Sequence, residues 1–379
     1  MIKKMWIGLV IALFIAHGLS LAAADKTEKP LSKDVSKLFE KAEKAMKAKK
    51  YDEAVESFNK AIELEPTYAP SYLGLALVQR DQKKLAESVE SLEKMFKIKP
   101  DAPIAAQVYR EILYAAGFDE YQKQDFKKSN DFFGKFLGIA GIETVAKKPV
   151  ENVLYQVGLN SYFLKEFDKS LEYFTKYVNI PGIDTSSAQW FQMANYMLGL
   201  DFTQLNQLEK SNASLQKFID LNKDPANQQI PIAYYLIGSN NYAGLDDQVK
   251  KMGTEMIDAL NNEGARINAD TKMKSKERDV AVAKHNEKKA QVTAEIKKKQ
   301  NQLAADRKDI TPNLLKAIEL RPDIEDAYVK LGNYHYLAGD LENGLKTYKT
   351  IKEKFPNSPD LVTYNNFIQK LEKEVTEKK

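Results

Sequence analysis

The sequence predicts an all-α protein built from a row of helical hairpins, and three regularities indicate this fold. Similar blocks recur every 41 residues, at Phe126–Phe133, Phe167–Phe174 and Leu208–Leu215. A small residue recurs twelve positions after another small one, as from Gly117 to Ser129. Large apolar residues follow at steps of four and three, which keep them on one face of a helix. These regularities describe a repeated unit of two closely packed helices.

Small residues mark the place where the two helices of each unit meet. The pairs are Ala42 and Ala54, Ala76 and Ser88, Gly117 and Ser129, Gly158 and Ser170, Gly199 and Ser211, and Gly332 and Gly344. A small side chain on each helix lets the two helix axes come close together. In three units a proline follows and ends the second helix, at Pro66, Pro100 and Pro356.

Two blocks resemble the tetratricopeptide repeat, a helix–turn–helix unit of about 34 residues. They are Tyr51–Pro66, and Tyr328–Gly332 running on to Tyr348 and Pro356. The resemblance covers about residues 35 to 260 and 312 to 358, and it implies a right-handed α-solenoid. A seventh first-helix site, Gly238, has Lys250 and Thr254 where its second helix should place a small and a large residue, so we expect a degenerate unit there.

The spacing of the first-helix small sites also indicates an insertion. Gly238 and Gly332 are 94 residues apart, and residues 265–308 hold 13 basic and 6 acidic residues without Gly or Pro. This composition predicts one long charged helix or two helices folded back on each other, similar to a coiled coil. Disorder is the alternative, because few apolar residues are present to offset chain entropy. Pairing of this insertion between copies would make a homo-oligomer.

These patterns divide the chain into five parts. We expect a signal peptide at residues 1–24, a linker at 25–34, a repeat array at 35–261, the basic insertion at 262–311, and a last repeat with its capping helix at 312–379. A lysine- and glutamate-rich end suits a helix that faces solvent at the end of an array.

The first residues follow the pattern of an export signal. A basic start at Lys3 and Lys4 precedes an apolar run, and Ala22–Ala24 provides small residues before Asp25. We therefore expect cleavage after Ala24 and a periplasmic or secreted bacterial protein. An uncleaved anchor is the alternative, since residues 5–24 are near the length of a membrane-spanning helix. No later segment is long and apolar enough to span a membrane.

The composition argues against several kinds of chemistry. The 57 Lys and Arg nearly balance the 53 Asp and Glu, so we expect no nucleic-acid partner. The chain has no cysteine and only three histidines, of which His17 lies in the expected signal. His285 and His335 have no obvious catalytic or metal-binding neighbours, and we interpret both as surface or packing residues. With no nucleophile motif and no phosphate-binding loop, we expect a protein that is not an enzyme and binds no cofactor or metal.

A stripe of tyrosines is the candidate binding site. These residues lie three positions before or four positions after the first-helix small site, so that pairs are two helical turns apart. They are Tyr114, Tyr121, Tyr155, Tyr162, Tyr196, Tyr235, Tyr242 and Tyr336. The resemblance implies that these positions line the concave surface of the solenoid, where tyrosine suits the binding of a peptide. The alternative is that the rings only pack between neighbouring first helices.

The sequence therefore predicts a non-catalytic scaffold of the bacterial cell envelope that binds a protein or peptide partner. This assignment rests on analogy with other proteins of the same fold. A glycan-binding or cell-wall-associated protein is one alternative, because tyrosine also stacks on sugar rings. A self-assembling structural protein is the other.

Overall fold

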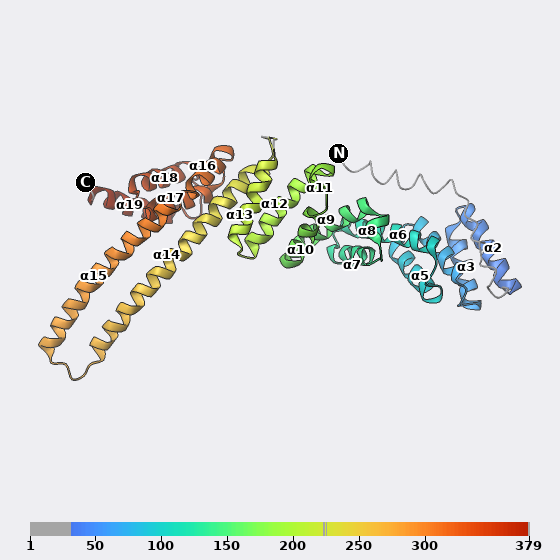
Figure 1. Cartoon of the computed structure of the whole chain (residues 1–379), viewed down its shortest axis with the longest axis horizontal. Coiled ribbons are helices and arrows are strands. Elements are labelled where there is room, and N and C mark those ends of the chain that lie inside the picture. Colours follow the sequence, from blue (N-terminus) through green and yellow to red (C-terminus); the bar gives the residue numbers. More distant parts are fainter. Residues whose placement is uncertain (1–31, 223, 225, 378–379) are drawn as a thin grey trace. The chain divides into compact units, whose positions relative to one another are not determined.

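The computed structural model describes residues 32–222, 224 and 226–377, and every regular element in these ranges is a helix (Figure 1). The all-α repeat fold is thus confirmed. The expected signal peptide at residues 1–24 and most of the expected linker lie outside the described residues. The chain divides into two compact units, residues 1–164 and 165–379, which we describe separately.

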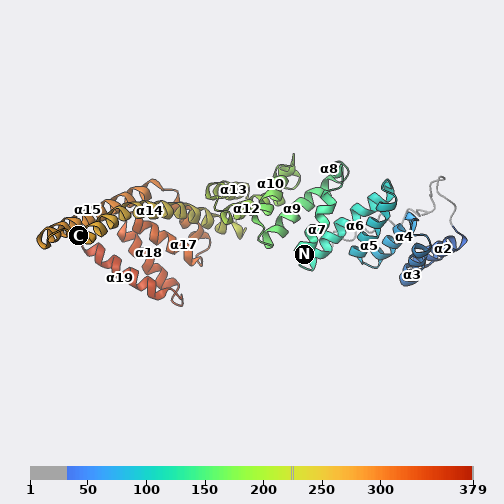
Figure 2. The same cartoon turned by 90° about the horizontal axis from the view of Figure 1, so that it is seen from below.

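Unit 1 contains three helical hairpins followed by one further first helix. Its helices are α2 (Lys33–Lys47), α3 (Tyr51–Leu64), α4 (Ala69–Asp81), α5 (Leu85–Ile98), α6 (Pro103–Gln122), α7 (Phe126–Leu137), the short α8 (Ile142–Val145) and α9 (Lys147–Phe163). The two helices of each hairpin pack together, and each second helix packs against the next first helix. Figure 2 shows this alternation from a second direction. Each hairpin therefore buries apolar surface both between its own two helices and against the following first helix.

The turn inside each hairpin has a recurring backbone geometry. After the first helix of the second hairpin, Lys83 adopts a left-handed conformation with φ of 63°, and the N–H of Lys84 donates to the carbonyl of Gln79 at 2.8 Å. This arrangement is a Schellman motif, which satisfies carbonyls left without partners at a helix end. The left-handed residue elsewhere is Lys49, Gln124, Lys165, Asn206 or Gly339. Only the last hairpin uses glycine at this position.

Close contact between the helices of a hairpin depends on the glycine predicted from the sequence. A β-carbon on Gly117 would lie 2.3 Å from the ring of Phe133, which is fully buried on α7. The same relation joins Gly199 to Leu215 and Gly332 to Tyr348, and each pair is 16 residues apart. The large residue of the second helix thus occupies the space that a glycine leaves on the first helix.

Unit 2 begins with a helix that follows the second-helix sequence pattern, and it ends with a single helix. Its helices are α10 (Phe167–Val178), the short α11 (Ile183–Ser186), α12 (Ala188–Gln204), α13 (Leu208–Leu221), α14 (Gln229–Ala269), α15 (Ser275–Asp306), α16 (Ile310–Leu320), α17 (Glu325–Leu337), α18 (Leu341–Lys354) and α19 (Leu361–Glu377). The hairpin α17–α18 packs against α19, whose Tyr364, Ile368 and Leu371 are buried. The last helix therefore covers the apolar face of the last repeat.

The unit at Gly238 is a complete hairpin whose second helix lies after the insertion. A β-carbon on Gly238 would lie 2.8 Å from the side chain of Leu314 on α16, and α14 packs against α16. The two residues are 76 positions apart instead of 16. The expectation of a degenerate second helix at Lys250 and Thr254 was therefore wrong, because both residues lie on the continuing α14. The insertion interrupts the turn of an otherwise ordinary repeat.

The interrupting segment, residues 250–309, is called the inserted hairpin below. It consists of the outer part of α14, a short connection and α15, and the two helices pack side by side (Figures 1 and 2). The expected boundary between residues 261 and 262 falls within α14, which is continuous there. Lys288 forms an ion pair with Glu263 across the pair at 2.6 Å, and a β-carbon on Gly264 would lie 2.8 Å from the ring of His285. Few side chains are buried between the helices.

The end of α15 returns to the repeats of unit 2. The hydroxyl of Tyr334 on α17 donates to the carbonyl of Ala304 at 3.1 Å, and both residues are buried. Lys297 forms an ion pair with Glu374 on α19 at 3.3 Å. The inserted hairpin is therefore attached at its base to the last repeat and to the final helix.

Candidate functional site

The candidate partner surface of each unit is a stripe on its own first helices, and we call these residues the first-helix stripe. It comprises the residues three before, one after and four after each small site, a spacing that places them on one helix face. These residues are Phe39, Glu43 and Met46 on α2; Leu73, Leu77 and Arg80 on α4; Tyr114, Phe118 and Tyr121 on α6; Tyr155, Leu159 and Tyr162 on α9; Tyr196, Leu200 and Thr203 on α12; Tyr235, Ser239 and Tyr242 on α14; and Val329, Asn333 and Tyr336 on α17.

In unit 1 the stripe tyrosines contact neighbouring side chains. The ring of Tyr114 lies 4.8 Å from that of Phe118, and its hydroxyl accepts a hydrogen bond from Asn152 on α9 at 3.0 Å. Burial raises the pKa of Tyr114. The ring of Tyr121 lies 6.0 Å from Phe126 on the next helix. Tyr114 thus connects two successive first helices and leaves only part of its ring exposed.

The fourth first helix shows the same mixture of burial and exposure. Tyr155 is 7 % exposed and belongs to the core, whereas Tyr162 is half-buried. The neighbouring Phe163 is 52 % exposed and its ring stacks on Phe126 at 5.1 Å. Tyr155 therefore cannot present its ring face to a partner, while Tyr162 and Phe163 retain exposed surface.

In unit 2 the stripe tyrosines also connect first helices. The Tyr235 hydroxyl donates to Asp326 on α17 at 2.5 Å, and Lys330 forms an ion pair with the same carboxylate. Burial, followed by the bond to Asp326, raises the pKa of Tyr235. Lys370 on α19 donates to the Tyr336 hydroxyl at 2.8 Å. These polar bonds link α14 to α17 and α17 to α19.

The remaining two stripe tyrosines of unit 2 pack against apolar clusters. Tyr196 lies 5.1 Å from the ring of Phe218, and Tyr242 packs against the cluster that includes Leu245 and Tyr334. Burial raises the pKa of Tyr242 to about 12. The packing alternative accounts for these contacts, and partner binding by the eight tyrosines stays a prediction.

The middle row of the stripe was missed in the sequence. Leu77, Phe118, Leu159 and Leu200 each follow a first-helix small site directly, and they are 41 residues apart. All four are half-buried. The apolar residue directly after each small site, repeated every 41 residues, is the sequence signal that identifies this row. The row supplies apolar surface that folding leaves partly in water.

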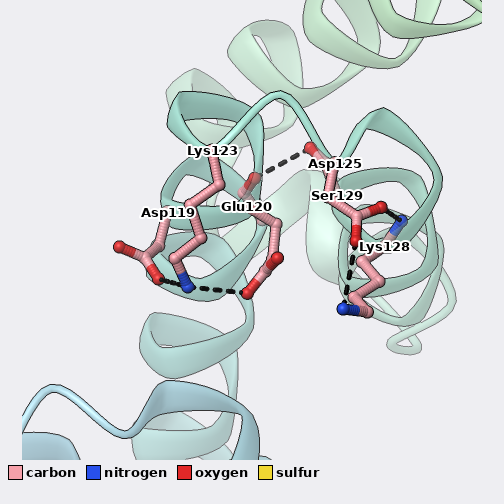
Figure 3. Close-up of polar contacts among 7 residues, drawn as sticks. Asp119, Glu120, Lys123, Asp125, Lys128 and Ser129 are labelled. Carbon is pink, nitrogen blue, oxygen red and sulfur yellow. Dashed lines mark hydrogen bonds and ion pairs between the residues drawn. The ribbon is translucent and has the colours of Figure 1, made fainter.

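The turn between α6 and α7, drawn in Figure 3, directly follows the stretch of α6 that contains Tyr121. The Lys123 ammonium lies 2.6 Å from an Asp119 oxygen and 2.9 Å from a Glu120 oxygen, and the bond to Asp119 is the main cause of its raised pKa. Asp125 accepts from the backbone N–H of Lys128 at 3.1 Å, which together with the ammonium of Lys128 lowers the pKa of Asp125. These exposed pairs add little stability.

The two remaining histidines have structural surroundings. His335 lies 3.5 Å from Asp340, and burial lowers its pKa. His285 packs on Gly264 inside the inserted hairpin. Across residues 32–377, apart from the two undescribed positions, no three His, Asp or Glu side chains gather where they could hold a metal ion.

Over the same part of the chain, no helix combines the length and the apolar character that crossing a bilayer requires.

Three segments of the chain match models of the tetratricopeptide repeat family. Residues 46–82 match a model described as TPR repeat. Residues 69–102 and 326–358 match two models described as tetratricopeptide repeat. The matched segments lie on α2 to α5 and on α17 to α18, where the hairpins have the closest spacing to the standard unit.

Two curated plant proteins are similar over a limited region. The DnaJ protein P58IPK homolog A of Oryza sativa subsp. japonica is 26 % identical over 109 residues, which is 27 % of this chain and 23 % of that protein. The DnaJ protein P58IPK homolog of Arabidopsis thaliana is 28 % identical over 111 residues, 28 % of this chain and 23 % of that protein. The similarity thus spans about a quarter of the length of these relatives.

Solved structures with helical repeats are similar at low identity. YrrB, titled a TPR protein with an unusual peptide-binding site, is 17 % identical, with a TM-score of 0.35 over 72 % of this chain and 97 % of that chain. The TPR domain of P58(IPK) is 14 % identical, with a TM-score of 0.26 over 90 % and 99 %. The MamA protein is 16 % identical, with a TM-score of 0.31 over 52 % and 97 %.

The family assignment rests on the repeat models and on the hairpin geometry, since these TM-scores are low. The matched segments contain the small sites Ala54, Ala76 and Gly332, and the helix pairs around them pack as the pattern requires. The chain therefore contains tetratricopeptide repeats at residues 46–102 and 326–358.

Proposed function

We propose that the chain is a non-catalytic scaffold whose first-helix stripe binds a peptide segment of a partner protein. The observation that carries this proposal is the middle row of the stripe in unit 1. Leu77, Phe118 and Leu159 are apolar, and none of the three is fully buried. Removing such side chains from water favours association by about 25 cal/mol for each Å² of apolar surface. The row is therefore suited to apolar side chains of a partner.

The contacts that the stripe tyrosines already make favour a peptide over a glycan. Sugar stacking needs an open aromatic face, and the rings of Tyr114 and Tyr196 already contact Phe118 and Phe218. The hydroxyl of Tyr114 is also bonded to Asn152. Leu77 and Leu159 have no ring face, so they offer apolar contact to a partner but cannot stack on a sugar ring. These contacts support a peptide partner of the kind described for helical grooves.

The location proposed with this function is the bacterial cell envelope. Its support is the export pattern of residues 1–24 in the sequence. N-terminal sequencing of the protein isolated from its own cells tests this part, and a chain that begins at Asp25 is the expected result. Retention of Met1 in the isolated protein would contradict it.

Two substitutions in the stripe test the binding function. Leu77→Glu and Leu159→Glu place a charge in the apolar row, and we expect either to weaken partner binding about tenfold or more, since tenfold corresponds to about 1.4 kcal/mol. The partner is first identified by a photo-reactive group at position 77 and then titrated as the purified protein. Circular dichroism and thermal melting check that both variants fold as the unchanged chain does.

Leu64→Glu is the matched control, because Leu64 is 59 % exposed on α3 and lies outside the stripe. Equal binding by the stripe variants and the unchanged chain would contradict the proposal, as would an equal loss in the Leu64 variant. Cross-linking only between copies of the chain, centred on residues 265–308, would instead support the self-assembly alternative. Tyr155 is unsuitable for this test because it is buried.

A further inference from the structure

A polar side chain recurs two residues after the first-helix glycine and joins neighbouring repeats. Asn160 on α9 donates to Ser129 on α7 at 2.8 Å, and Asn240 on α14 donates to Ser211 on α13 at 2.9 Å. The corresponding residue on α12 is Asp201, which accepts from Ser170 on α10 at 2.8 Å. We call each of these contacts a repeat joint. Two joints therefore use an amide and one uses a carboxyl group.

The amides of the two asparagine joints have further partners. Asn160 also donates to Asn130 at 3.0 Å and accepts from Gln156 at 3.0 Å. Asn240 also donates to Asn212 at 2.9 Å. The residue after the serine is thus an asparagine in both joints. These networks satisfy buried polar atoms, as protein interiors require.

The aspartate joint lacks this second partner. The residue after Ser170 is Leu171, and the Asp201 side chain is 0 % exposed. Its Oδ1 atom has no hydrogen-bond partner among the described residues. An ionised carboxylate that is buried with only one oxygen hydrogen-bonded costs free energy, because the other oxygen has lost its water and gained no other partner. The protonated carboxyl costs far less and can donate to Ser170 Oγ, as the asparagine amides donate to their serines.

Charged groups on the surrounding helices do not offset this cost. The helices that pack against α12 within unit 2 are α10, α11 and α13. Their charged side chains are all exposed; they are Asp168, Lys169, Glu172 and Lys176 on α10, Asp184 on α11, and Glu209, Lys210, Lys217 and Asp220 on α13. Burial, only partly opposed by the bond from Ser170, raises the pKa of Asp201 to about 7. The carboxyl therefore changes its charge near neutral pH.

We propose that Asp201 makes the joint between α10 and α12 sensitive to pH, with the protonated carboxyl holding the two repeats together and the ionised carboxyl loosening them. The ordinary pKa of the group is 3.8. Between that value and about 7 the folded chain holds a proton that the unfolded chain has released, so stability falls as the pH rises through this range. Above about pH 7 both states are ionised and the loss is complete.

The test compares the full chain with the Asp201→Asn variant over pH 5 to 8. Asparagine cannot ionise and matches the other two joints. We expect its melting temperature to exceed that of the unchanged chain by an amount that grows by about 3 to 5 °C for each pH unit up to pH 7 and is then constant. Hydrogen exchange should show that the difference is largest in α10 and α12.

Asp168→Asn is the control, because it removes a carboxylate that is exposed on α10. Its melting temperature should follow that of the unchanged chain at every pH. A difference for Asp201→Asn that does not vary with pH would overturn the proposal, and so would equal behaviour of the two variants. If Asp201→Asn fails to fold, ¹³C NMR of the aspartate carboxyl groups in the unchanged chain decides. A buried carboxyl titrating near pH 7 supports the proposal, whereas titration of every carboxyl below pH 5 overturns it.

Discussion

The repeat hairpins and the inserted hairpin are both antiparallel pairs of helices, but they are held together differently. In the α6–α7 hairpin, Phe133 and Phe136 are at most 1 % exposed, and Phe133 fills the space beside Gly117. In the inserted hairpin, between residues 250 and 309, the buried side chains are Leu260, Ile296 and Ala304. The difference shows that a repeat gains stability from packing on two sides, while the inserted hairpin, beyond its base, has only the contact between its own two helices.

The neighbours of each hairpin explain this difference. A helix that packs against one partner leaves most of its surface in water, so its sequence can be almost entirely polar. Residues 265–308 follow this rule, with 19 charged residues. A helix between two neighbours needs apolar residues on two faces, as α12 has with Ala194, Leu198 and Gly199 buried. Packing, more than helix propensity, separates the two kinds of hairpin.

The largest expected effect is on the glycine contact of the repeats. Gly117→Ala places a methyl group 2.3 Å from the Phe133 ring, and we expect unit 1 to lose about 1 to 3 kcal/mol of stability, as overpacked cores do. Urea unfolding followed by circular dichroism measures the change. Gly134→Ala on α7 is the matched control, because nothing lies within 4 Å of the added atom, and it should gain about 0.5 to 1 kcal/mol. Similar losses in both variants would show that the contact is not the cause.

A smaller effect is expected at the turns of the repeats. Lys83 has φ of 63°, a conformation that costs about 1 kcal/mol in any residue with a β-carbon. Lys83→Gly removes this strain but adds freedom to the unfolded chain, so we expect a net gain of about 0.5 kcal/mol. Thermal melting of the variant measures it. The opposite change, Gly339→Ala, should be destabilising, because its β-carbon would lie 2.8 Å from Asn301. A loss of stability in Lys83→Gly would contradict this account of the turn.

The smallest effect is expected for shortening the inserted hairpin. Residues 258–291 are replaced by a short glycine-containing turn that joins Ile257 to Val292. These two residues lie opposite each other, because Gly264 and His285 are in contact and lie seven residues further along each helix towards the tip. The base, with Ile296 and the Lys297–Glu374 pair, is retained. We expect the denaturant midpoint of unit 2 to stay the same and its free energy of unfolding to change by less than about 0.5 kcal/mol. The reason is that residues far apart, with no shared partners, contribute independently to stability. A clear loss of stability would show that the outer hairpin supports the repeats.

The hairpin fold was predictable because it depends on a local pattern. The steps from Gly117 to Ser129 and on to Phe133 correspond to contacts that the structure contains. The pairing of Gly238 with Leu314 was not predictable from spacing, since 76 residues separate them. Leu314 and Pro322 are eight residues apart, the same spacing as Tyr348 and Pro356 at the end of an ordinary repeat. Only the packing of α14 on α16 identifies them as one unit.

The candidate site was only partly accessible from the sequence. The stripe positions of Tyr114 and Tyr336 followed from helix periodicity. Their hydroxyl partners, Asn152 and Lys370, could not be found because they lie on other repeats. The burial of Tyr155 was hidden for the same reason, since periodicity gives the face of a helix but not the depth at which a neighbour covers it.

The interrupted repeat has a consequence for how such arrays acquire new parts. A flexible connection of about 60 residues in place of the usual three-residue turn would raise the entropic cost of closing the loop by about 3 kcal/mol. The inserted hairpin avoids most of this cost, because α14 and α15 run out and back and return the chain to the place it left. The contact of Gly238 with Leu314 is kept. The turn of a repeat is therefore a point at which a folded module can be grafted without disturbing the array on either side.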